Sequence, residues 1–122
     1  MTVPEPRVSP VTYVVCGLPE DHPDADAFEV RVEYRGDGLW VVRRLGRFLG
    51  RDGTWSYCYV WRDGAQEPTT DAELAEYSSG EDAWRAEHRF DLDTALRMAK
   101  DVAPLVKCNG YTVADVLKEW QP

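Results

Sequence analysis

Two histidines and three cysteines are the side chains of this chain with the most obvious capacity for catalysis. Cys16, His88 and Asp91 are the residue types of a nucleophile, a base and an orienting carboxylate. Nothing in their spacing requires them to meet. His88 shares an alternating face with Trp84 and Phe90, which is typical of a core or subsurface histidine. We therefore expect no catalytic residues and a protein that is not an enzyme.

Possible metal ligands gather in "HPDAD", residues 22–26, but their spacing fits no recognised metal site. His22 in this acidic loop is expected to be a solvated surface residue. The segment "GRFLGRDG" lacks the lysine and the following Ser or Thr of a phosphate loop. Cys16, Cys58 and Cys108 form no CxxC pair, so they predict free thiols in a reducing compartment. The sequence predicts no metal and no cofactor.

The stretch "TWSYCYVW", residues 54–61, concentrates aromatic side chains. In a strand, Trp55, Tyr57, Tyr59 and Trp61 would share one face. Such a face could be core, because each ring buries enough area to contribute several kcal/mol at roughly 25 cal/mol per Å². It could instead be a partly exposed platform that holds bases, sugars or a partner's apolar patch. We expect a mostly buried wall, with Trp61 near its exposed end.

Charge is unevenly distributed along this acidic chain, whose formal net charge is −8. Arginines dominate residues 31–62, and acidic residues dominate residues 63–87. The two regions could neutralise each other, or could form a two-signed docking surface. The net charge disfavours nucleic acid as a partner, although single strands could bind locally and the acidic segment could mimic nucleic acid. A protein partner is favoured, and the candidate interaction surface comprises Trp55, Trp61, Arg43, Arg47, Arg51 and Arg62.

Alternating and β-branched segments predict an antiparallel meander that would position these residues. About five or six strands are expected, at residues 11–18, 28–35, 39–45, 47–49, 54–61 and 83–90. Two amphipathic helices follow: one begins after Asp91 and stops at Pro104, and one begins after Thr112. An Asn-Gly turn separates them. The predicted fold is α+β, with the two C-terminal helices covering one face of the sheet.

The chain is expected to form a single domain over residues 11–122, preceded by a flexible, proline-rich tail at residues 1–10. An acidic, partly flexible insert is expected at residues 63–82. Within it, Thr70 and Glu73 would cap a short helix, and "SSGED" would be a linker. No apolar run approaches the roughly 20 residues that span a bilayer, and the N-terminus does not have the layout of a signal peptide. We expect a cytoplasmic protein without a membrane partner.

The segment "HRFDLDTALRMAKDVAPLVKCNGYTVADVLKEW", with "GRDGTWSY" upstream, resembles small uncharacterised proteins of Streptomyces-like actinobacteria and their phages. The resemblance covers most of the chain from Tyr13 onward and lies in the order of motifs. It implies a bacterial or phage setting. It implies no activity and no role for any residue. From the absence of a catalytic pattern and the distribution of aromatic and charged residues, we expect a small accessory or phage-encoded protein that acts by binding another protein.

Overall fold

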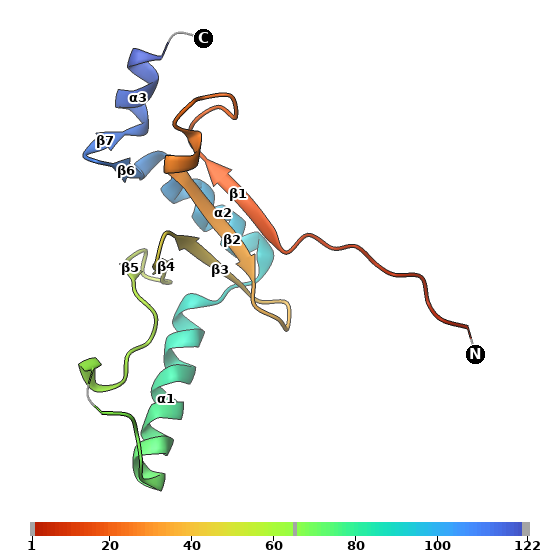
Figure 1. Ribbon diagram of the computed structural model, residues 1–122, viewed down its shortest axis with the longest axis vertical. Helices are drawn as coiled ribbons and strands as arrows, with labels where there is room; N and C mark the ends of the chain where they lie inside the picture. The colour runs from red at the N-terminus through yellow and green to blue at the C-terminus, as the bar shows by residue number, and fades with distance from the viewer. Residues whose placement is uncertain (1, 65, 121–122) are drawn as a thin grey trace.

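The computed structural model describes residues 2–64 and 66–120 and has an α+β fold built on a five-stranded antiparallel sheet (Figure 1). The strands follow one another in chain order, so the predicted meander is confirmed. They are β1 (Thr12–Cys16), β2 (Glu29–Tyr34), β3 (Trp40–Arg44), β4 (Arg47–Leu49) and β5 (Trp55–Ser56). A short 3-10 helix, η1 (Ala25–Phe28), precedes β2.

The alternation predicted along β2 is confirmed at its centre. Val30 and Val32 are fully buried, and Val32 lies opposite Val42 of β3. Glu33, which directly follows Val32, points to the other face of the sheet, because successive side chains in a strand alternate. The turn to β3 has positive φ at Gly36, Asp37 and Gly38, a conformation that glycine adopts without steric cost.

Helix α2 (Leu92–Val102) packs against β1, β2 and β3 and covers the core face of the sheet. Ala95 and Ala99 are fully buried, and their small side chains let the helix approach the strands closely. Asp91 caps the helix by accepting a hydrogen bond from the Thr94 N–H at 2.8 Å. The helix passes into a 3-10 turn, η3 (Ala103–Leu105), at Pro104, so the predicted start and stop are confirmed.

The C-terminal part forms a small hairpin followed by a short helix. Strands β6 (Lys107–Cys108) and β7 (Tyr111–Thr112) pair through the Asn109-Gly110 turn, where both residues have positive φ. Helix α3 (Val113–Glu119) begins with a capping box between Thr112 and Asp115. It packs against η3 and β7 and contributes Val113 to one end of the core.

Helix α1 (Asp71–His88) replaces two predicted elements, the "SSGED" linker and the strand at 83–90. The predicted capping box at Thr70 and Glu73 is present, but the helix continues through the serines and the glycine. Gly80 lies against Tyr59, so a Cβ at this position would collide with the Tyr59 hydroxyl. The strand prediction was wrong because residues 83–88 are rich in strong helix formers, and propensity outweighs a short alternation.

The predicted strand at residues 54–61 is also wrong in its length. Strand β5 ends at Ser56, and the chain then leaves the sheet and runs beside α1 (Figure 1). The four rings therefore share no common face: Trp55 is half-buried, Tyr57 is exposed, Tyr59 contacts Tyr77 of α1, and Trp61 is buried. Side chains alternate between two faces only while a strand stays paired in a sheet, and β5 pairs with β4 over only two residues.

Candidate functional site

Trp61 and Arg62, two residues of the candidate surface, belong to a contact between the 3-10 helix η2 (Trp61–Gly64) and α1. Trp61 is only 7% exposed, contrary to its predicted exposed position, and its Nε1–H donates to the Glu76 carboxylate at 3.1 Å. The Arg62 guanidinium lies over the Trp61 ring and forms an ion pair with Glu76 at 2.7 Å. These contacts hold η2 against α1 and present no free aromatic surface.

Arg43 and Arg51 are likewise engaged within the fold. Arg43 donates from Nε and Nη2 to the two carboxylate oxygens of Glu33, at 2.8 and 2.9 Å. This paired hydrogen bond lowers the pKa of Glu33, with the Arg43 charge adding to the effect. Arg51 donates to the carbonyls of Ala86 and Arg89 and so ties the turn after β4 to the end of α1. Both arginines position structural elements.

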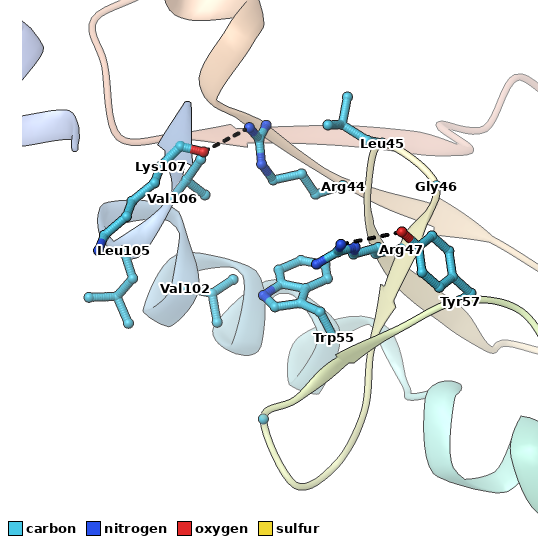
Figure 2. A pocket seen from close by; sticks show the side chains of 11 residues that line it. Arg44, Leu45, Gly46, Arg47, Trp55, Tyr57, Val102, Leu105, Val106 and Lys107 are labelled. Atoms are coloured by element: carbon cyan, nitrogen blue, oxygen red, sulfur yellow. Dashed lines mark hydrogen bonds between the residues drawn. The ribbon is translucent and has the colours of Figure 1, made fainter. Parts of the chain in front are cut away.

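Trp55 and Arg47 meet at a cleft of about 590 Å³, which we call the Trp55 cleft (Figure 2). One side comes from the ends of β3, β4 and β5, and the other comes from the end of α2, η3 and β6. Two of the six predicted surface residues therefore lie together. The cleft is lined by Arg44, Leu45, Gly46, Arg47, Gly53, Trp55, Tyr57, Val102, Leu105, Val106 and Lys107.

The lining of the Trp55 cleft contains three cationic side chains and no carboxylate. Arg44 donates to the backbone carbonyls of Glu29 and Lys107, at 3.3 and 3.4 Å, and Arg47 donates to the Tyr57 hydroxyl at 3.3 Å. Across residues 2–64 and 66–120, none of Arg44, Arg47 and Lys107 forms an ion pair. A concave surface of one sign concentrates the field for a ligand of the opposite sign.

Large apolar side chains stand exposed around the same cleft. Leu45, Leu105 and Tyr57 are 76%, 74% and 63% exposed. Leu45 also has a φ of 55°, in the left-handed region that a leucine occupies at a cost of about 1 kcal/mol. Leu45 is thus a strained residue whose exposed apolar side chain lines the cleft, and strained residues are common at ligand-binding positions.

Sequence reasoning missed Arg44, Lys107, Leu45 and Leu105 as residues of this site. Arg44 had a signal, because it lies next to Arg43 at the end of a predicted strand. Lys107 had no such signal in the sequence, because it lies 63 positions after Arg44 along the chain. Only the way β6 returns beside the β3–β4 turn brings the two together.

His88 is buried, as predicted, and joins α1 to β5. Its Nδ1–H donates to the Trp84 carbonyl at 2.7 Å, which leaves Nε2 to accept from the Ser56 hydroxyl at 3.0 Å. A serine–histidine contact is the geometry of an activated nucleophile. Here neither Ser56 nor His88 lines the Trp55 cleft, and His88 is stacked on Trp84 with ring centroids 4.3 Å apart. The Ser56–His88 hydrogen bond therefore acts as a structural link. Cys16 lies elsewhere, and its thiol donates a hydrogen bond to the Ala25 carbonyl.

His22 corrects another expectation, because it is 5% exposed and not solvated. Its ring lies 4.8 Å from that of Trp120, which follows α3 and covers the loop, and its Nδ1 accepts from the Asp24 N–H at 2.9 Å. Cys16, Cys58 and Cys108 are separate free thiols. In the part of the chain that the structure describes, no three His, Cys, Asp or Glu side chains cluster as metal ligands, and no helix is long and apolar enough to cross a bilayer.

No family model, curated protein or solved structure matches this chain. Function is therefore inferred from the side chains that line the Trp55 cleft.

Proposed function

We propose that this protein is a non-enzymatic, cytoplasmic interaction module of a bacterium or its phage, and that the Trp55 cleft binds an acidic segment of a partner protein. The observation that carries the proposal is the combination in one cleft of exposed apolar side chains with three cations that form no ion pair within the described residues.

The chemistry of the lining defines the segment that would fit. Trp55 and Val102 offer an apolar floor for one or two large side chains of the partner. Arg44, Arg47 and Lys107 offer donors to flanking Asp or Glu side chains. Aromatic and arginine residues are the common anchors of protein interfaces. The partner segment should therefore carry an apolar centre between acidic neighbours.

Single-stranded nucleic acid is the alternative occupant. A strand needs several stacking rings along a basic groove. Of the aromatic and arginine residues expected to form such a face, Trp61 is buried and Arg43 and Arg62 are bonded to carboxylates. A single half-buried indole and an exposed tyrosine remain beside the cations. This arrangement favours a short peptide over a nucleic-acid strand.

Selection from a displayed random-peptide library tests the proposal. The wild-type chain should enrich peptides that have an apolar residue flanked by Asp or Glu. Leu105→Ser, at the rim of the cleft, should bind the selected peptides at least tenfold more weakly, and Leu39→Ser, exposed on the β2–β3 hairpin, should bind them normally.

A second arm measures labelled single-stranded DNA at low salt. Binding that falls steeply with salt and is lost in Leu105→Ser would favour the nucleic-acid alternative. Enrichment of basic peptides, or equal binding by the Leu105 and Leu39 variants, would contradict a site for acidic segments at this cleft.

A further inference from the structure

A second pocket, of about 250 Å³, lies on the opposite face of the sheet from α2, between the sheet and α1. Its lining includes Val41 and Phe48, which alternate with the core residues Val42 and Leu49. Three arginines reach it from two elements: Arg35 follows β2, and Arg85 and Arg89 come from the end of α1. We call it the arginine pocket, and it shares no lining residue with the Trp55 cleft.

The three arginines are not equally compensated. Arg85 forms an ion pair with Glu81, and Arg35 pairs with Glu33 at 3.2 Å. Arg89 has no ion pair among residues 2–64 and 66–120, and its Nε–H is buried without an acceptor. A buried donor without an acceptor costs roughly 1–3 kcal/mol. The Nε–H of Arg89 thus lacks a hydrogen-bond partner, and the carboxylates of Glu81 and Asp37 act on this side chain only from beyond ion-pair distance.

The electrostatics of the pocket oppose the charge that Arg89 carries. Burial lowers the pKa of Arg89, and the neighbouring charges of Arg85 and Arg35 lower it further. Arginine nevertheless keeps its proton in proteins. The lining as a whole holds three positive side chains and one carboxylate, that of Glu81. Because Arg35 already pairs with Glu33 and Arg85 with Glu81, the charge left without an ion pair is that of Arg89, and an anionic ligand would compensate it.

We infer that the arginine pocket binds a phosphate group, carried either by inorganic phosphate or by a phosphomonoester. Guanidinium groups present paired N–H donors that match the oxygens of phosphate, and several arginines together can bind a doubly charged anion. The volume of the pocket admits such a group. The edge-on contact of Phe48 with Trp84, with ring centroids 5.4 Å apart, gives the pocket a firm wall.

Thermal unfolding of the full chain with rising sodium phosphate, against sodium chloride at equal ionic strength, tests this inference. The wild-type midpoint should rise by several degrees and saturate, as binding to the native state requires, and chloride should have no such effect. Arg89→Gln should lose this response. Because the substitution removes an uncompensated charge, the phosphate-free variant should be at least as stable as the wild type.

Two further variants separate a binding role from a structural one. Arg89→Lys keeps the charge but not the paired donors, so its affinity for phosphate should fall about tenfold. Arg31→Gln, at an exposed position on β2, should respond like the wild type. Titration of inorganic phosphate and of a phosphoserine peptide, each by calorimetry, shows which source binds more tightly. An equal phosphate response in Arg89→Gln and wild type, or no saturation at all, would overturn the inference.

Discussion

The two longer helices contact the sheet in different ways. Helix α2 presses fully buried alanines onto the core face, where β1, β2 and β3 meet it. Helix α1 buries a single side chain, that of His88, and contacts the other face through separate links: a ring contact between Trp84 and Phe48, the hydrogen bond from Ser56, and the donors of Arg51. Figure 1 shows α1 extending beyond the sheet beside residues 57–64 and 66–70.

This difference indicates separate roles for the two faces. Close apolar packing around α2 supplies the stability of the domain, since burial of apolar area is the main favourable term in folding. The hydrogen bonds and ring contacts of α1 fix its position but contribute less free energy to folding. They also leave charged groups between α1 and the sheet. The Trp55 cleft lies at the end of the α2 side, and the arginine pocket lies on the α1 side. Four predictions test the comparison.

Overpacking should have the largest effect, and only under α2. Ala99→Leu inserts three carbon atoms at a fully buried site, so we expect a loss of about 3 kcal/mol in unfolding free energy, measured by urea denaturation. Ala83→Leu makes the same change on the exposed side of α1 and should alter stability by less than about 0.5 kcal/mol. Similar losses in both variants would show that the helices are packed alike.

Removing the link between α1 and β5 should have the next largest effect. His88→Ala removes the ring stacked on Trp84 and leaves the Ser56 hydroxyl without its partner, so we expect a loss of about 2 kcal/mol. Ser56→Ala removes one hydrogen bond and should cost about 1 kcal/mol. Hydrogen exchange should show the added opening in α1 and not in α2. If hydrogen exchange became faster to the same extent in both helices, α1 would belong to the same cooperative folding unit as α2.

A smaller effect is expected at Gly80. Alanine in a helix interior is favoured over glycine by about 1 kcal/mol. Because its Cβ would meet the Tyr59 hydroxyl, Gly80→Ala alone should give no gain in unfolding free energy. In a Tyr59→Ser background the same change should recover about 1 kcal/mol. As a control, Ser79→Ala at the exposed neighbouring position should change the unfolding free energy equally in both backgrounds. A gain of about 1 kcal/mol from Gly80→Ala alone would show that Tyr59 does not pack on α1.

The smallest predicted effect is the loss of unfolding free energy at low pH when Glu33 becomes protonated. Bonding to Arg43 lowers the pKa of Glu33 below its ordinary value of 4.5, so the ionised form stabilises the fold above that pH. This contribution, less than about 1 kcal/mol for a part-buried pair that solvent still screens, is lost as the pH falls through the folded-state pKa. Glu33→Gln should therefore be less stable than wild type at pH 7, and the gap should close below pH 4.5. Urea unfolding from pH 3 to 7 measures it, with Glu20→Gln as a control that should show no gap.

The sequence predicted the elements whose periodicity and end signals agree. Strand β2 alternates cleanly, and α2 has both an apolar stripe and a cap at Asp91. Prediction failed where local patterns conflicted. Helix α1 has few apolar residues and a glycine in its middle, and only its contact with Tyr59 explains that glycine. The cleft could be predicted only in part, since Trp55 and Arg47 are close in sequence but Lys107 arrives through the fold.

The left-handed backbone at Leu45 has an evolutionary consequence. Glycine would relax that turn and make the domain more stable, and it would also remove the exposed side chain from the mouth of the cleft. Drift under selection for stability alone would favour glycine there. Among descendants of this chain, a large apolar residue retained at position 45 would mark the lineages in which the cleft is still in use.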